Sequence, residues 1–229
     1  MMNLYSTLRS STRNWQRSRQ YLKTYEQFRE FTMVPASVYE DNLLIAERVR
    51  NVSGCVVECG VWRGGMIAGI ASILGCNREY FLFDSFEGLP PAQSIDGDSA
   101  IAWQKDTDSS NYHDNCSAPP EMAEKAMHLA GVNSFHITKG WFNQTLPDFK
   151  APLPIALLRL DADWYESTTL CLEHLFDQVA AGGLIVLDDY YSWDGCSRAL
   201  HDFLSRRSSV ERIHSFGSVC FLKKITPPI

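Results

Sequence analysis

The segments IALLRLD at residues 155–161 and GLIVLDD at residues 183–189 decide the fold of this 229-residue chain. Each is a short apolar run that ends in aspartate, and such runs are typical of strands buried on both faces of a parallel sheet. The pattern of residues 167–180 predicts a helix between them, so the three segments make one βαβ crossover. Ligands bind outside the carboxyl ends of the strands in such sheets, and the aspartates are therefore expected to share one site.

The same pattern extends in both directions along the chain. Further strands are predicted at 55–59, 79–84 and 134–140 and in the C-terminal segments ERIHSF and VCFLKKI, and further helices at 14–30, 37–50 (with Ser37 as N-cap), 66–75, 117–130 and 195–207. This alternation predicts an α/β fold with a doubly wound, mostly parallel sheet and a C-terminal antiparallel strand pair.

The length allows one sizeable α/β domain with a buried core. We predict an N-terminal helical extension or lid over residues 1–35 and a single domain over residues 36–229. Within that domain, residues 85–115 are rich in Gly, Pro, Asp and Ser and have the length of a functional lid loop. The basic N-terminal segment contains several aromatic residues and could pack across a homo-oligomer.

Charge and composition exclude several classes of protein. The net charge of −6 argues against nucleic acid as the main partner. The sequence shows no apolar run long enough to cross a bilayer, so no membrane span is expected. The seven cysteines include no CxxC pair, which suits a reducing compartment, and a cytoplasmic location without disulfides or a zinc site is expected.

Asp161, Asp188 and Asp189 follow the two deciding strands and form the candidate metal site. Three unpaired carboxylates would repel one another, whereas a hard divalent cation would neutralise them. Asp163 points the same way as Asp161 in an extended chain, so one of the two could ligate and the other support. Asp188 and Asp189 would diverge in a strict strand, and both reach one metal only where the strand has become a loop; otherwise Asp189 would cap the helix near Asp194.

The turn GVWRGG at residues 60–65 lies between a predicted strand and a predicted helix. Its glycines allow a ligand to approach the backbone, and the helix N-terminus favours anionic groups. Its spacing is neither GxGxxG nor that of a P-loop, so a purely structural turn is the alternative. Asp84 ends the next strand, where an acid can bind ribose hydroxyls or simply cap the following turn. Together the two features favour a ribose-bearing cofactor.

Six segments in order carry a resemblance to a known family: VVECGVWRGG, FLFDSFEGLP, KGWFNQTLP, LLRLDADWYEST, GGLIVLDDY and GCSRALHDF. Over about residues 35–207 the chain resembles the macrocin O-methyltransferases, which are class I S-adenosylmethionine enzymes. The resemblance implies a Rossmann-like methyltransferase fold. It also implies Mg²⁺-dependent transfer of a methyl group from S-adenosylmethionine to a sugar hydroxyl of a glycosylated small molecule.

The resemblance also assigns site residues. It places Glu58 and Gly60 at the methionine end of the cofactor, Asp84 at its ribose, and Gly140 and Trp141 near its adenine. Val61 and Ser85 adjoin these positions and are included in the cofactor site. Asp161, Asp188 and Asp189 take the metal-ligand positions. Ala162 replaces the usual glycine of the motif, which should be tolerated unless that residue needs a positive φ.

In the implied reaction a base takes the proton of the acceptor hydroxyl, and Asp161 is the leading candidate, with His113 in reserve. A phenolic or catechol hydroxyl is an alternative acceptor. The alternative activities are a metal-dependent nucleotide-sugar glycosyltransferase, with Asp161-Ala162-Asp163 as its DxD motif, and a haloacid-dehalogenase-like phosphatase. A cofactor-binding subunit without catalytic activity is the remaining alternative, although such a subunit would have no need to hold three carboxylates together.

Overall fold

One seven-stranded sheet forms the centre of the protein, as a computed structural model covering residues 19–207 and 210–225 shows. The strand order is β3-β2-β1-β4-β5-β7-β6, with the first five strands parallel and the last two antiparallel. The strands are β1 (Cys55–Cys59), β2 (Tyr80–Asp84), β3 (Phe135–Lys139), β4 (Ile155–Leu160), β5 (Val179–Leu187), β6 (Ile213–Phe216) and β7 (Val219–Lys223). The predicted α/β fold is confirmed.

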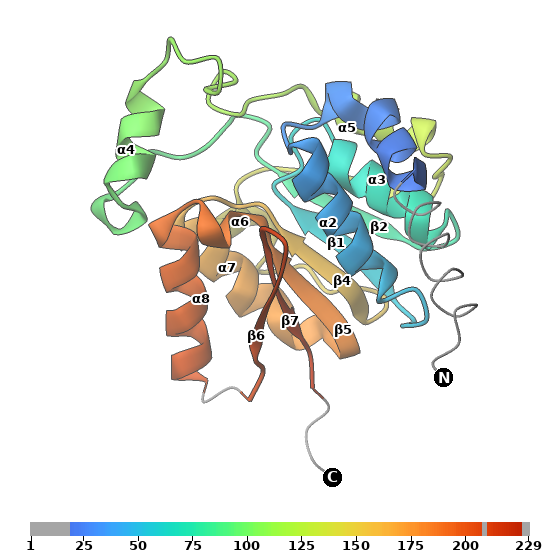
Figure 1. Cartoon of the computed structure of the whole chain (residues 1–229). Helices are drawn as coiled ribbons and strands as arrows, with labels where there is room; N and C mark the ends of the chain where they lie inside the picture. The colour runs from blue at the N-terminus through green and yellow to red at the C-terminus, as the bar shows by residue number, and fades with distance from the viewer. Residues whose placement is uncertain (1–18, 208–209, 226–229) are drawn as a thin grey trace, which may run out of the picture.

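Helices cover both faces of the sheet (Figure 1). One face carries the helix at residues 19–28, α2 (Ala36–Glu47), α3 (Gly65–Leu74) and α5 (Pro120–Leu129). The other carries α6 (Phe142–Thr145), α7 (Tyr165–Leu175) and α8 (Asp194–Arg206). None of the helices in the described part of the chain is long and apolar enough to cross a membrane.

The pleat of the central strands divides the core in two. Val56 and Leu157 belong to the cluster under α2 and α3, whereas Val57 and Leu158 belong to the cluster under α7 and α8. Side chains two residues apart along a strand lie on the same face of the sheet. Glu58 and Arg159, two residues after Val56 and Leu157, therefore lie on the face covered by α2 and α3.

The N-terminal segment packs on this core. Residues 19–28 are helical and continue into η1 (Arg29–Phe31), while the first part of the predicted helix lies outside the described residues. Tyr21 and Phe28 are buried in the same cluster as α3. The predicted N-cap at Ser37 is wrong, because the extended Pro35 takes that position and its carbonyl accepts the Tyr39 N–H.

The predicted lid loop at residues 85–115 contains structure of its own. It includes η2 (Ser94–Asp96) and α4 (Asp98–Lys105), which projects from the body at the upper left of Figure 1. The buried Asp96 fixes the segment, since its Oδ1 accepts the Tyr165 N–H at 2.7 Å and its Oδ2 accepts the Gln93 N–H at 2.8 Å. The lid is therefore attached to the first turn of α7. The helix after it begins at Pro120, with Pro119 rather than Ser117 as its N-cap.

A glycine allows α2 to lie directly on α3. The Tyr39 hydroxyl donates to the Gly65 carbonyl at 2.8 Å, and a Cβ atom placed on Gly69 would lie 1.8 Å from that hydroxyl oxygen. Gly69 is therefore required by close packing, because its neighbour is a fully buried tyrosine.

We predict that Gly69→Ala lowers the free energy of unfolding in urea by about 2 kcal/mol through overpacking. Helix propensity alone would change stability in the opposite direction by about 1 kcal/mol. Ser72→Ala, on the exposed side of α3, is the matched control and should shift stability by less than about 0.5 kcal/mol. An alanine variant as stable as the wild type would show that Tyr39 can move aside freely.

Candidate active site

A buried arginine lies at the centre of the strand ends. Arg159 pairs in register with Glu58 on β1 and is only 1% exposed. Its Nη1 lies 2.8 Å from Glu58 Oε1 and 2.8 Å from Asp161 Oδ2, and its Nη2 lies 2.7 Å from Asp188 Oδ1. The guanidinium therefore joins the ends of β1, β4 and β5.

Helix α2 completes this network through Asn42. The Nε of Arg159 donates to Asn42 Oδ1 at 3.1 Å, and Asn42 Nδ2 donates to Asp188 Oδ1 at 3.1 Å. Sequence reasoning missed both residues. The available signal was an arginine inside the apolar run LLRL, since a fully buried guanidinium requires anionic partners nearby.

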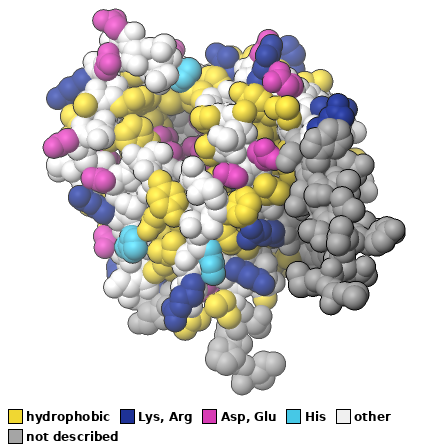
Figure 2. All heavy atoms as spheres, in the orientation of Figure 1, with side chains coloured by type: hydrophobic (Ala, Val, Ile, Leu, Met, Phe, Trp, Pro, Cys, Tyr) yellow, Lys and Arg dark blue, Asp and Glu magenta, His cyan; other side chains and the backbone are white. Residues whose placement is uncertain are grey.

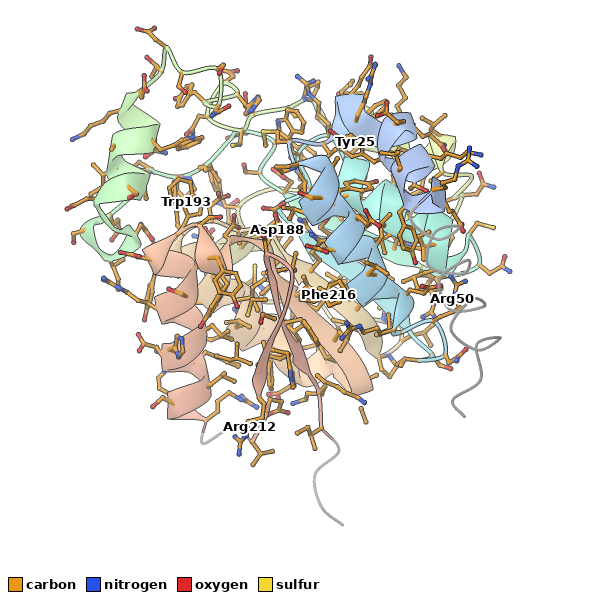
Figure 3. The ribbon with its side chains drawn as sticks, in the orientation of Figure 1. Tyr25, Arg50, Asp188, Trp193, Arg212 and Phe216 are labelled. Carbon is orange, nitrogen blue, oxygen red and sulfur yellow. The ribbon has the colours of Figure 1, made fainter. Side chains whose placement is uncertain are left out.

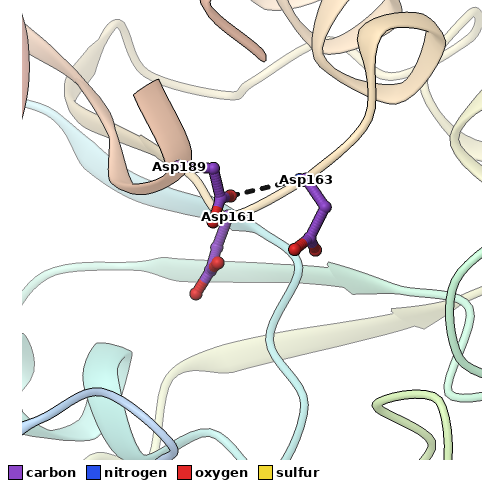
Figure 4. A group of neighbouring side chains, drawn as sticks. All are labelled: Asp161, Asp163 and Asp189. Atoms are coloured by element: carbon purple, nitrogen blue, oxygen red, sulfur yellow. Dashed lines mark hydrogen bonds between the residues drawn. The ribbon is translucent and has the colours of Figure 1, made fainter. Parts of the chain in front are cut away.

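A second cluster of carboxylates lies beside the first. One carboxylate oxygen from each of Asp161, Asp163 and Asp189 falls within 4.8 Å of the other two (Figure 4). Asp189 Oδ2 accepts the backbone N–H of Asp163 at 3.1 Å, and Asp163 Oδ1 accepts the Trp193 indole N–H at 2.9 Å. We refer to these three residues as the carboxylate trio.

The trio differs in one member from the metal-ligand set predicted from sequence. Strand β5 ends at Leu187 and η4 (Asp188–Tyr191) follows, so the two adjacent acids separate. Asp188 turns toward Arg159 on the α2 side, whereas Asp189 meets Asp163. Figure 3 shows Asp188 at the upper end of the sheet and Trp193 on the side toward α4.

Acidic side chains outnumber cationic ones in this site, and the pKa values of several of these acids are raised. Burial raises the pKa of Asp163 to about 8 and that of Asp161 to about 6, although the Arg159 guanidinium lowers the latter. Burial also raises the pKa of Glu58 to about 8, against the influence of Arg159, and that of Asp189 well above its ordinary value. The site therefore favours bound protons or a bound cation over bare carboxylates.

Two adjoining cavities open at this end of the sheet, and the corresponding face is hollowed beside the projecting α4 (Figure 2). The first, of about 260 Å³, is lined by five of the predicted cofactor residues: Gly60, Asp84, Ser85, Gly140 and Trp141. The second, of about 200 Å³, is lined by the other two, Glu58 and Val61, together with Arg159 and all four aspartates. We call them the cofactor cavity and the carboxylate cavity; Gly60, Asp161 and Asp163 line both.

Asp84 organises the glycine turn from the end of β2. Its Oδ2 accepts the N–H groups of Val61 at 2.6 Å and Trp62 at 2.7 Å, and its Oδ1 accepts that of Phe86 at 2.6 Å. A carboxylate has about four acceptor positions, so one on Oδ1 is left for a ligand hydroxyl. Gly60 has a φ of +84°, and a Cβ there would lie 1.6 Å from the Asp161 carbonyl oxygen. Only glycine fits this position.

Comparison with known proteins identifies the family. A model of the family described as macrocin-O-methyltransferase (TylF) matches residues 24–222, which is most of the chain. The chain belongs to this family. It is 34% identical over 162 residues to a tetracenomycin rhamnosyl 4'-O-methyltransferase of Streptomyces olivaceus, covering 68% of this chain and 59% of that protein. It is 30% identical over 163 residues to demethyldecarbamoylnovobiocin O-methyltransferase of Streptomyces niveus, covering 68% and 60%.

Solved structures agree with this assignment. The structure of the O-methyltransferase NovP superimposes with a TM-score of 0.70 at 26% identity, covering 86% of this chain and 83% of that one. A calicheamicin methyltransferase matches with a TM-score of 0.64 at 17% identity, covering 88% and 91%, which shows the shared fold. The chain spans only about three fifths of the length of the first two curated relatives.

The structure places two further residues of this macrocin-O-methyltransferase family member: Ala162, where the family motif has glycine, and His113, the second candidate for the general base. Ala162 replaces the motif glycine without a positive φ, and the left-handed conformation falls instead on Asp163 at +54°. The alanine is therefore accommodated. His113 is exposed and lies apart from the trio, where it lines an outer groove and packs edge-on against Trp62 with 6.0 Å between ring centroids.

We predict that, in buffer containing a chelator, the protein loses stability as pH rises from about 5 to 8. Between the ordinary carboxyl pKa of about 4 and the raised values of Asp161 and Asp163, the folded state binds more protons than the unfolded state. The free energy of unfolding therefore falls with increasing pH, by about 1 to 2 kcal/mol across this range. Urea denaturation at each pH measures it. Asp163→Asn should flatten the profile, and a wild-type profile that rises toward pH 8 would contradict the raised pKa values.

Proposed function

We propose that this protein is an S-adenosylmethionine- and Mg²⁺-dependent O-methyltransferase that acts on a sugar hydroxyl of a glycosylated small molecule. The observation that carries the proposal is that Asp161 and Asp163 line both the cofactor cavity and the carboxylate cavity. A methyl donor that extends from the cofactor cavity to Glu58 in the carboxylate cavity, and an acceptor hydroxyl beside Asp161 and Asp163, would meet at the trio. The family match and the names of the two curated relatives support this substrate class.

The residues present fit the cofactor. Glu58 Oε2 is buried and has no hydrogen-bond partner among the described residues, so the ammonium group of a methionine moiety would satisfy it. The remaining acceptor position on Asp84 would take one ribose hydroxyl. Gly140 and Trp141, which follow β3, would border the adenine. Gly60, Val61 and Ser85, which also line the two cavities, complete the proposed cofactor site.

The trio fits a hard divalent cation. Three carboxylate oxygens within 4.8 Å of one another are the donors that Mg²⁺ prefers, with water completing its shell. We propose that Asp161, Asp163 and Asp189 hold the ion, while Asp188 holds Arg159 in place. The sequence predicted a different ligand set, with Asp188 in place of Asp163. The experiment below distinguishes between the two sets.

The chain's own residues would then position the acceptor and take its proton. When bound, S-adenosylmethionine supplies an electrophilic methyl group and Mg²⁺ lowers the pKa of a nearby hydroxyl. Asp161 has a pKa of about 6, so it is ionised at neutral pH and can accept that proton. Arg159 occupies Asp161 Oδ2, which leaves the other oxygen outside this pair. Fixed orientation of donor and acceptor lowers the barrier further.

We predict that Asp161→Asn and Asp163→Asn each lower kcat/KM for methyl transfer about a thousandfold, since the first removes the proton acceptor and a cation ligand and the second removes a cation ligand. Isothermal titration should show weakened Mg²⁺ binding but little change in affinity for S-adenosylhomocysteine. Asp148→Asn, an exposed aspartate that lines neither cavity, is the control. Loss of Mg²⁺ binding in Asp188→Asn but not in Asp163→Asn would favour the alternative ligand set, and activity insensitive to EDTA would overturn the metal assignment.

We also predict that S-adenosylhomocysteine raises the thermal unfolding midpoint by several degrees, whereas a uridine diphosphate sugar does not. Glu58→Gln should weaken cofactor binding about tenfold, because a neutral amide replaces the acceptor for the ammonium group. Differential scanning fluorimetry and titration with the cofactor measure both effects. Stabilisation by the nucleotide sugar alone would favour a glycosyltransferase instead.

A further inference from the structure

Each carboxylate of the trio accepts a hydrogen bond from a different kind of donor. Arg159 Nη1 donates to Asp161 Oδ2 at 2.8 Å, and the backbone N–H of Asp163 donates to Asp189 Oδ2 at 3.1 Å. Asp163 itself accepts the indole N–H of Trp193 on Oδ1 at 2.9 Å. Trp193 is the N-cap residue of α8 and lies outside the sheet. Asp163 is thus the member of the trio that is oriented by an aromatic side chain from beyond the strand ends.

The indole of Trp193 is fixed in this position. Its backbone N–H donates to the Asp189 carbonyl at 2.9 Å, and its ring packs edge-on against that of Trp164 with 5.3 Å between centroids. Trp164 is only 2% exposed, and its own indole N–H donates to the Pro90 carbonyl at 2.9 Å. The Trp193 ring therefore cannot turn away from Asp163 without losing its packing.

The lid adds a third indole to this pair. Trp103 on α4 is half-buried and lies edge-on to both rings, 6.2 Å from Trp164 and 6.0 Å from Trp193 between centroids. Its N–H donates within the lid, to the Asn111 carbonyl at 3.2 Å. Figure 3 shows Trp193 on the side of the sheet toward α4. We call Trp103, Trp164 and Trp193 the tryptophan cluster; through it the lid packs against the residue that orients Asp163.

We propose that Trp193 is a positioning residue that orients Asp163 for a divalent cation, and that Trp103 of the lid supports it in this role. The inference rests on the proposed function, in which Asp163 is a cation ligand. An indole has one donor and no acceptor, so Trp193 can orient the carboxylate without competing for the ion. Its hydrogen bond occupies Oδ1 and leaves Oδ2 outside this pair. Partners that orient a ligating side chain typically contribute about 10- to 100-fold to metal affinity.

The acceptors of the three indole N–H groups distinguish Trp193 from its neighbours. Trp193 donates to a carboxylate, whereas Trp103 and Trp164 donate to backbone carbonyls. Trp193 is half-buried at the edge of the apolar cluster under α7 and α8, where filling space would require no polar atom directed at the trio. The three residues share their packing and differ in the acceptor, so the same substitution at two of them separates the hydrogen bond from the ring.

The test uses three variants of the full chain. Trp193→Phe keeps a ring and removes the N–H that Asp163 accepts, and Trp103→Phe is the matched control, because it removes an N–H that donates to a lid carbonyl. Trp103→Ala removes the ring contact between the lid and Trp193 without touching the core beneath α7. Isothermal titration measures the affinity for Mg²⁺ and for S-adenosylhomocysteine, and urea denaturation verifies that each variant is folded. Methyl transfer is followed as a function of Mg²⁺ concentration.

We expect Trp193→Phe to bind Mg²⁺ about tenfold more weakly than the wild type, with little change in affinity for S-adenosylhomocysteine. The Mg²⁺ concentration at half-maximal rate should rise by the same factor, while kcat at saturating Mg²⁺ is largely kept. A merely structural role would instead lower kcat at every Mg²⁺ concentration. Trp103→Ala should weaken Mg²⁺ binding about threefold through the lost aromatic contacts, and Trp103→Phe should bind as the wild type does.

The outcomes separate this inference from the proposed function. Wild-type affinity for Mg²⁺ in Trp193→Phe, or equal weakening in Trp103→Phe, would overturn the positioning role alone. Wild-type affinity in Trp103→Ala would overturn the part assigned to the lid. Weaker Mg²⁺ binding in Trp193→Phe, without methyl transfer by the wild type to any glycoside, would overturn the proposed function and support the positioning role. A wild type that binds no Mg²⁺ would overturn both.

Discussion

The buried Arg159 guanidinium is the interaction on which the rest of the site depends. It holds Glu58, Asp161 and Asp188 within 2.8 Å and so joins three neighbouring strands at their carboxyl ends. Removing one partner from such a buried group leaves an uncompensated charge, which typically costs about 3 to 5 kcal/mol. The acids that pair with Arg159 therefore cannot relax toward solvent individually, and their positions follow from the register of the three strands.

The pleat explains why two adjacent aspartates have different partners. Val186 and Asp188 lie on the α2 side of the sheet, so Asp188 reaches Arg159, whereas Asp189 belongs to the turn that follows. One step along the chain thus separates a charge-compensated cluster from an uncompensated one. Asp161 belongs to both, since one of its oxygens pairs with Arg159 while it also contributes to the trio. A change in the charge of the trio therefore alters the electrostatic interaction between Asp161 and Arg159 directly.

The sequence predicted what depends on local pattern and missed what depends on tertiary contact. The five parallel strands and the glycine turn follow from apolar runs and from the conformational freedom of glycine. The partners of Arg159 follow from strand register, and the entry of Asp163 into the trio follows from its left-handed backbone at φ +54°. Neither can be obtained from spacing alone. Helix α4 was not predicted, because the composition of its segment is that of a loop. The segment is held by a tertiary contact, since Asp96, just before α4, accepts a hydrogen bond from the first residue of α7.

An excess of acid also suits a reaction in which the cofactor changes charge. S-adenosylmethionine carries a sulfonium cation, and S-adenosylhomocysteine does not. Glu58 and the four aspartates that line the carboxylate cavity therefore attract the substrate form of the cofactor more strongly than the product form, in a buried setting where Coulomb interactions are large. Arg159 limits this effect, since it pairs with Glu58, Asp161 and Asp188 and leaves Asp163 and Asp189 as the acids of this cavity that it does not contact. In the proposed enzyme, the same arrangement that requires a cation would thus bind the methyl donor and weaken the hold on its product.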